Sequence, residues 1–444
     1  MPAHESMMEN LLKQVSDLIN GMCKRPPGTG GSPGPRIDLH PAFVVGPQHI
    51  IGEFKTRTEI VDGSGVRRGI FWNVAGTEVG WEGEPYKELR KLAEKISLLP
   101  EFNGQIDIEN AFDVVCEWFL APIRGTPVAP FFPHVKTVLE QSVESFEIWV
   151  PIAHAFSSED FAIGDVEFKT ITRELLDSWL GRLSPPEMDQ QVKAQYNQRT
   201  RQKLQASLAA CVKLTADSAT AHRVALEKAT EATALLRFLC VVNSSPYSRS
   251  YVAPSGLSAQ RSWTGLRFKN DVISSISEKA VGKGPGAWHI SEARKFMPGL
   301  LESLSDLASN RSTPFRKDVY DAFQLYSRNS ISDDLADRLL YFTVALESIL
   351  VPRSEGSIQA LLAERVAFLT GTDPKERLEI AKLIKKGYAL RSKFVHAGRK
   401  VEDMEIAENF FDRAWHTMAV LLNLRDAYPT KEALIESLEL RKYQ

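Results

Sequence analysis

Three side chains in the last quarter of the chain could carry acid–base or anion chemistry: Glu347, Arg391 and His396. A guanidinium binds phosphate or carboxylate through two donors, and an imidazole gains and loses a proton near neutral pH. Glu347 and Arg391 each interrupt an otherwise apolar helical stripe, and a buried charge is costly unless it is paired. We therefore expect the two side chains either to meet or to line one cavity between helices, although an ordinary structural salt bridge explains them equally well.

The spacing of Arg391 and His396 bears on where their side chains meet. Five positions on a helix correspond to about 140° of rotation, so the two residues do not share a face. The imidazole is expected beside Ser392 and Lys393, near the helix C-terminus, where the helix dipole favours its protonated form. This geometry suits a site assembled between two copies of the chain, whereas a single histidine near a helix end is more often structural.

Positive charge is concentrated around this motif. The whole chain has a formal net charge of -2, so a surface for a polyanion must be local. Residues 375–400 contain nine basic side chains against Glu376 and Glu379, which favours anion binding over an ordinary solvated helix face. The basic residues are Lys375, Arg377, Lys382, Lys385, Lys386, Arg391, Lys393, Arg399 and Lys400.

Four helices are expected to position these side chains, at residues 332–352, 357–370, 373–395 and 403–428. Apolar residues recur at helical spacing in each of them. Ser332 is predicted to cap the first helix, Gly371 to follow the second, and Asp373 to cap the third; the fourth is expected to follow Asp403. The short loops between them indicate an up-down bundle.

The segments ALESILVP and KKGYALRSKFVHAGRK, in this order of helices, resemble the HEPN superfamily and within it the ApeA-like branch, over residues 331–428. The R-x(4–6)-H motif of the family is met by Arg391 and His396. Glu347 matches the glutamate that commonly accompanies the motif, and Tyr388 matches the aromatic residue before it. The resemblance implies a metal-independent endoribonuclease without a cofactor, which cleaves single-stranded RNA at the interface of a homodimer and could serve as a defence or toxin effector.

In that reaction a 2′-hydroxyl attacks the neighbouring phosphorus. The resemblance makes His396 the general base or acid and Arg391 the group that holds the phosphate and stabilises its developing charge. Lys393 and Arg399 would add charge nearby. Ser392 stands where catalytic members often have Asn, Asp or His, so the alternative is a non-catalytic HEPN module for dimerisation or RNA binding.

The rest of the chain predicts an α+β multidomain protein. We expect an N-terminal helix and flexible linker at residues 1–36 and a mixed α/β domain of unknown role at 37–185. A helical middle region with an irregular or β insert follows at 186–330, including a long helical pattern at 187–242. The four-helix HEPN bundle at 331–428 and a tail at 429–444 complete the chain.

Several other classes of function receive little support. No apolar run is long enough for a membrane span, the N-terminus has no signal-peptide pattern, and the four cysteines are scattered, so a cytoplasmic protein without a zinc site is expected. Two E-x-K sequences, Glu53–Lys55 (with Asp38 upstream) and Glu167–Lys169, imitate the metal site of restriction-type nucleases, but this pattern is frequent by chance. The histidines at 134, 154 and 289 have no partner at metal-ligand spacing.

Overall fold

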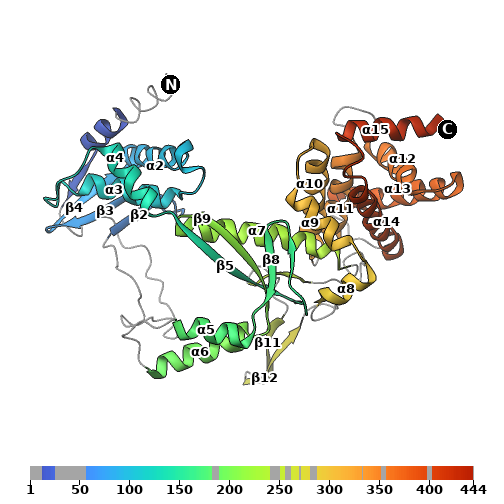
Figure 1. The fold of residues 1–444 in the computed structure, drawn as a ribbon, viewed down its shortest axis with the longest axis horizontal. Coiled ribbons are helices and arrows are strands. Elements are labelled where there is room, and N and C mark those ends of the chain that lie inside the picture. Colours follow the sequence, from blue (N-terminus) through green and yellow to red (C-terminus); the bar gives the residue numbers. More distant parts are fainter. Residues whose placement is uncertain are drawn as a thin grey trace. The chain divides into compact units, whose positions relative to one another are not determined.

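The computed structural model describes residues 13–25, 57–182, 190–240, 251–255, 262–269, 272–280, 288–332, 334–351, 357–397 and 403–443. Helices and sheets occur together in it, so the α+β class predicted from the sequence is confirmed (Figure 1). Two compact units divide the chain: residues 1–146 with 214–223, and residues 147–213 with 224–444. Among the described helices, none is long and apolar enough to cross a membrane.

The first unit contains a four-stranded antiparallel sheet in the order β1-β4-β3-β2. Ala75 and Gly76 connect β3 to β4, and both take a positive φ, 49° and 81°, as the tight turns of two-residue hairpins require. Its strands are β1 (Cys23–Arg25), β2 (Arg57–Val61), β3 (Arg67–Val74) and β4 (Thr77–Glu82). Its helices are α2 (Gly83–Ser97), α3 (Ile108–Leu120) and α4 (Phe131–Gln141), with a short 3-10 turn, η3, at Pro100–Phe102.

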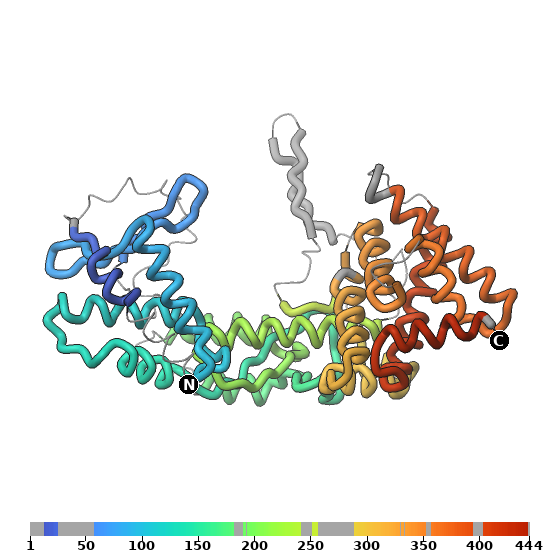
Figure 2. The backbone as a smooth tube through the Cα atoms, turned by 90° about the horizontal axis from the view of Figure 1, so that it is seen from above, coloured from blue at the N-terminus to red at the C-terminus, as the bar shows by residue number. Residues whose placement is uncertain are grey.

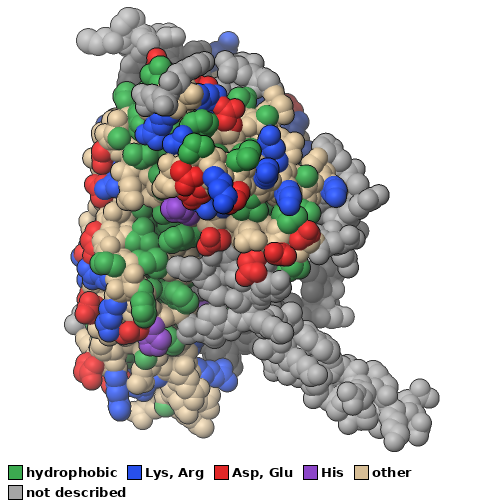
Figure 3. Space-filling view, turned by 90° about the vertical axis from the view of Figure 1, so that its right-hand side faces the viewer, with side chains coloured by type: hydrophobic (Ala, Val, Ile, Leu, Met, Phe, Trp, Pro, Cys, Tyr) green, Lys and Arg blue, Asp and Glu red, His purple; other side chains and the backbone are tan. Residues whose placement is uncertain are grey.

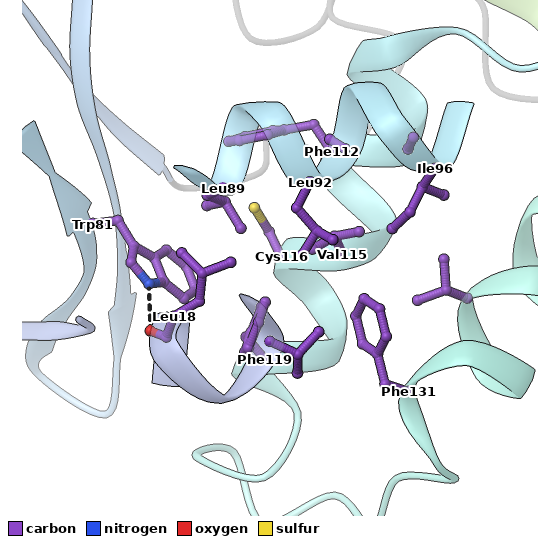
Figure 4. Close-up of a cluster of buried hydrophobic side chains, with 14 of the residues drawn as sticks. Leu18, Trp81, Leu89, Leu92, Ile96, Phe112, Val115, Cys116, Phe119 and Phe131 are labelled. Atoms are coloured by element: carbon purple, nitrogen blue, oxygen red, sulfur yellow. Dashed lines mark hydrogen bonds between the residues drawn. The ribbon is translucent and has the colours of Figure 1, made fainter. Parts of the chain in front are cut away.

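The core of this unit lies between the sheet and the three helices, where aromatic and aliphatic side chains interdigitate (Figure 4). Trp81 is fully buried in it, and its indole N–H donates to the Leu18 carbonyl oxygen at 3.0 Å. A buried indole needs such an acceptor. The bond fixes the helical residues 13–20 to the sheet.

The second unit contains most of a five-stranded sheet in the order β10-β5-β9-β8-β7. Helices α5 (Arg173–Arg182) and α6 (Gln190–Leu204) come between β8 and β9 in the chain, and α7 (Ser218–Phe238) follows β9. The strands are β5 (Glu144–Ala153), β7 (Phe161–Ile163), β8 (Val166–Thr170), β9 (Leu208–Ala216) and β10 (Ala253–Pro254).

The expectation of one long helical pattern over residues 187–242 is wrong, because β9 interrupts it. Residues 208–212 are buried without a break, which is typical of a strand covered on both faces and not of an amphipathic helix. Ala206, with a φ of 62°, ends the preceding helical segment, and its N–H donates to the Ile171 carbonyl oxygen. The alanines at 209 and 210 are good helix formers, but their place in the sheet overrides that preference.

The remaining elements of the middle region are a parallel pair, a hairpin and three helices. The pair is β6 (Ala155–Phe156) with β13 (Trp288–His289), and the antiparallel hairpin is β11 (Ser262–Lys269) with β12 (Val272–Ala280). The helices are α8 (Ile290–Phe296), α9 (Leu300–Ser309) and α10 (Pro314–Asn329). Part of the predicted β insert is therefore present.

Five α-helices follow and pack against one another; they are drawn in orange to red in Figure 2. The four predicted helices are present within the described residues as α11 to α14, and α15 packs against α11 and α12. Their bounds are α11 (Leu335–Leu350), α12 (Ile358–Thr370), α13 (Pro374–Ala397), α14 (Met404–Asn423) and α15 (Lys431–Leu440), with a final 3-10 turn, η5, at Arg441–Tyr443.

The caps of these helices test the sequence prediction residue by residue. Asp373 accepts from the Lys375 and Glu376 N–H groups, so its predicted cap is confirmed. Helix α14 follows Asp403 as predicted, and Asp403 also caps it by accepting from the Ile406 N–H. The predicted Ser332 cap is wrong. Asp334 caps α11 instead and accepts from the N–H two residues later at 2.8 Å, while the Ser332 hydroxyl accepts from the Asp334 N–H.

Gly371 follows α12 as predicted, but for a different reason than expected. Its φ is -94°, which is not the left-handed conformation that commonly ends a helix. A Cβ at this position would lie 2.8 Å from the Ala367 carbonyl oxygen and 2.8 Å from Arg377 Cγ. Glycine is therefore required by the close approach of α13 to the last turn of α12.

Candidate functional site

Helix α13 carries the predicted motif, and its position against α14 depends on a glycine. A Cβ at Gly387 would lie 2.3 Å from Phe410 Cδ2, far closer than atoms can approach. Phe410 is fully buried on α14. The missing side chain at Gly387 thus lets the two helices pack closely just before Tyr388 and Arg391, although glycine inside a helix costs about 1 kcal/mol.

Tyr388 and Arg391 of α13 lie together with Glu347 of α11. The guanidinium carbon of Arg391 is 5.6 Å from the centre of the Tyr388 ring. The pKa of Tyr388 is raised by its burial and then by the negative charge of Glu347, against the opposing effect of Arg391. The phenol is therefore neutral at physiological pH and remains a hydrogen-bond donor. We call these three residues the Tyr388 cluster.

The direct ion pair that we expected between Glu347 and Arg391 is not formed, although both side chains are within the described part of the chain. One carboxylate oxygen of Glu347 and Nε of Arg391 are buried, and neither has a hydrogen-bond partner among the described atoms. Buried polar atoms without a partner are costly. The second alternative from the sequence, a cavity between helices lined by both charges, stays a prediction.

The other predicted site residues are Ser392, Lys393, His396 and Arg399. Ser392 is half-buried and Lys393 is exposed. The backbone at position 396 is part of α13, but the side chain of His396 lies outside the described residues, as does Arg399. The relation between Arg391 and His396 therefore stays a prediction.

A ridge of lysines runs along the exposed side of α13. Its five members are all exposed, and none forms an ion pair with a carboxylate in the described ranges; they are Lys375, Lys382, Lys385, Lys386 and Lys393. Figure 3 shows the side of the molecule on which the C-terminal helices lie, with Lys and Arg side chains spread among Asp and Glu. Unpaired cations on one helix face attract a polyanion.

Two buried arginines in the same helices were missed by the sequence analysis. Arg338 is fully buried, with its guanidinium carbon 4.9 Å from the centre of the Phe411 ring. Arg365 is 3% exposed and donates to the Leu350 carbonyl oxygen at 2.8 Å and to the Glu439 carboxylate. Arg365 thereby joins the end of α11 to α15. Both arginines interrupt apolar helix faces, the same signal that identified Glu347 and Arg391.

The alternative metal site at Glu167 and Lys169 can be examined on β8. The Glu167 carboxylate forms ion pairs with Lys169 and with Lys213 of β9, and these cations lower its pKa, Lys169 most strongly. The other E-x-K sequence, with Asp38, lies outside the described residues. Within the described ranges, no three His, Cys, Asp or Glu side chains are grouped so that they could hold a metal ion.

Comparison of the chain with known proteins gives no relative: no family model, no curated protein and no solved structure matches it. The resemblance to the HEPN superfamily therefore rests on the motif, its spacing and the order of the helices.

Proposed function

We propose that the C-terminal helices form a HEPN-type domain that cleaves single-stranded RNA without a metal ion. The observation that supports this most directly is the Tyr388 cluster. In this cluster Arg391 and Tyr388 of α13 lie near Glu347 of α11, and these are the three residues that the resemblance matches to the motif arginine, the motif aromatic and the accompanying glutamate. The lysine ridge on α13 supplies a surface for the RNA backbone.

In the proposed reaction, His396 removes the proton of a 2′-hydroxyl, which attacks the adjacent phosphorus. Arg391 neutralises the charge that develops on the phosphate oxygens, and the neutral Tyr388 phenol is a further donor beside it. The bond from phosphorus to the 5′-oxygen breaks, and that oxygen takes up a proton. The products are a 2′,3′-cyclic phosphate and a 5′-hydroxyl end.

A homodimer is part of the proposal. Arg391 and position 396 are separated by about 140° around one helix, so a single α13 does not direct both side chains at one phosphate. Two copies that meet along this helix would bring the histidine of one copy to the arginine of the other. The second candidate function is a non-catalytic module that binds RNA or dimerises, which the serine at position 392 favours.

The test is cleavage of purified single-stranded RNA by the full-length protein in EDTA, with end-group analysis of the products. His396→Ala and Arg391→Ala are compared with His416→Ala, a control at an exposed histidine of α14. We expect cyclic phosphate ends from the wild type and the control, and a loss of at least about 100-fold in rate for the two motif variants. DNA of the same sequence has no 2′-hydroxyl and should remain intact.

Cleavage that requires a divalent cation, or that persists in both motif variants, would contradict the proposed site. RNA binding without cleavage under any condition would favour the non-catalytic module.

A further inference from the structure

A cleft of about 540 Å³ lies in the second unit, away from the Tyr388 cluster. Its lining residues come from the turn between β7 and β8, one face of α7, the end of α9, and Arg311 and Tyr320 at the start of α10. Its volume falls within the roughly 300–1,000 Å³ of small-molecule sites. Its lining is part apolar, from Ile163, Val166, Val224, Ala232 and Leu235, and part charged.

The walls of the cleft are fixed to one another. Gly164 takes a φ of 64°, and a Cβ there would lie 3.1 Å from the Ala308 side chain, so the β7–β8 turn packs directly on α9. Its N–H donates to the Ser305 hydroxyl at 3.2 Å. On the other side, Lys228 of α7 forms an ion pair with Asp165 of the turn. The cleft is thus formed by ordered elements and needs no closure to exist.

One tyrosine in the cleft contacts both an arginine and a glutamate. Tyr320 is 4% exposed, and the guanidinium carbon of Arg311 lies 3.7 Å from the centre of its ring. The Tyr320 hydroxyl donates to the Glu231 carboxylate at 2.7 Å, and Gln324 donates to the backbone oxygen of Glu231. Burial, and then Glu231, raises the pKa of Tyr320 strongly, so this hydroxyl remains a donor.

Arg311, over the face of the Tyr320 ring, and Glu231, at its hydroxyl, therefore present opposite charges beside one aromatic side chain. Neither forms an ion pair with a residue that the structure describes, whereas the charges of Lys228 and Asp165 neutralise each other. The guanidinium retains a planar set of donors suited to a carboxylate. The carboxylate of Glu231 is suited to an ammonium group.

We propose that this cleft binds a small zwitterion, an α-amino acid being the simplest member of the class. The carboxylate of the ligand pairs with Arg311, its ammonium group pairs with Glu231, and its side chain packs against the apolar lining. The volume of the cleft leaves room for a large side chain. This binding does not depend on ribonuclease activity.

The test is the thermal unfolding of the full-length protein with each protein L-amino acid in turn at millimolar concentration, followed by calorimetry for those that raise Tm. The matching amines without a carboxylate, and the matching carboxylic acids without an amine, are the comparison compounds. We expect at least one amino acid to raise Tm in proportion to its concentration, as a ligand of the folded state must, and the comparison compounds to have little effect.

Arg311→Gln and Glu231→Gln should each weaken binding at least about tenfold, the value of one hydrogen bond to a charged group. Arg173→Gln, at an exposed arginine of α5, should bind like the wild type. Because Arg311 is exposed, the Arg311→Gln variant should fold normally. It therefore tests the proposal even if the Glu231→Gln variant does not fold. The absence of any shift with the wild type, equal binding of the plain acids, or undiminished binding by Arg311→Gln would overturn the proposal.

Discussion

At the scale of single residues, a charged side chain within an otherwise apolar helix face was the most informative feature of the sequence for locating buried charges. The structure gives different surroundings to four such residues: Glu347, Arg391, Arg338 and Arg365. Arg365 has a carboxylate and a carbonyl as partners, and Arg338 lies over an aromatic ring. Glu347 and Arg391 border Tyr388 and leave buried polar atoms without a described partner. This last pair differs from the two arginines because both of its charges act on one side chain, the Tyr388 phenol.

The first prediction concerns the charge acting on Tyr388. Glu347→Gln removes the negative charge that helps to raise the Tyr388 pKa, so the pKa of this phenol should fall. The measurement is an ultraviolet pH titration of each protein minus that of its Tyr388→Phe counterpart. Glu408→Gln, at an exposed position of α14, is the control. An unchanged titration would show that Glu347 does not face the phenol.

The upward shift of the Tyr388 pKa also predicts how the stability of the protein depends on pH. The folded state holds the phenolic proton more tightly than the unfolded state, so this group contributes stability below the unfolded pKa of about 10. The contribution should disappear as the pH rises through the folded pKa. Urea unfolding at neutral and alkaline pH should therefore show a smaller alkaline loss of stability for Tyr388→Phe than for the wild type. Equal losses for the two proteins would contradict the raised pKa.

At the scale of elements, the position of α13 is set by its caps and by Gly387. Asp373 and Pro374 begin the helix as the sequence predicts. Its packing on α14 depends on a contact that no periodicity shows, because the Phe410 ring occupies the space where a Cβ at position 387 would be.

Gly387→Ala should therefore destabilise the protein, although alanine is the better helix former. We expect a loss of about 1–3 kcal/mol from overpacking, measured by urea unfolding. Lys386→Ala, one residue earlier on the exposed side, should change stability by less than about 0.5 kcal/mol. A gain in stability for Gly387→Ala would show that α13 and α14 can separate at no cost.

At the scale of the whole molecule, a charge network joins α9 and α10 to the segment after α14. Arg316 is 3% exposed and pairs with Asp306 and Asp426. Arg425 donates to Asp306 at 2.8 Å. The helices that border the cleft are thereby attached to the segment after α14, and α14 in turn packs on α13.

This network predicts a loss of stability in acid. Burial alone would raise the pKa of Asp306, but hydrogen bonds from Arg316 and Arg425 outweigh it, and the pKa is lowered. A carboxylate whose pKa is lower in the folded than in the unfolded state stabilises the protein at pH values above its unfolded pKa of about 3.9. That stabilisation is lost as the pH falls through the folded pKa. Asp306→Asn should thus be less stable than the wild type at neutral pH, and the difference in unfolding free energy should shrink in acid. A constant difference would mean that Asp306 is not paired.

The sequence by itself determined the α+β class, the order and bounds of most C-terminal helices, and the Asp373 cap. These features depend on residues that are neighbours in the chain: periodicity, an aspartate before a helix, a proline at its first position. The same local rules failed at Ser332, where a second capping residue stood two positions later, and at β9, where buried alanines imitate a helix.

Only the tertiary structure decided which distant residues meet. It showed that Glu347 and Arg391 both lie near Tyr388 without forming an ion pair. It also showed that a phenylalanine ring packs against Gly387, and that Arg311 and Glu231 both contact one tyrosine. The periodicity of a helix predicts which face a residue occupies. It does not predict how far away the neighbouring helix lies or which side chains of that helix face the residue. Those depend on packing between segments far apart in the chain, which a single sequence does not encode as a local pattern.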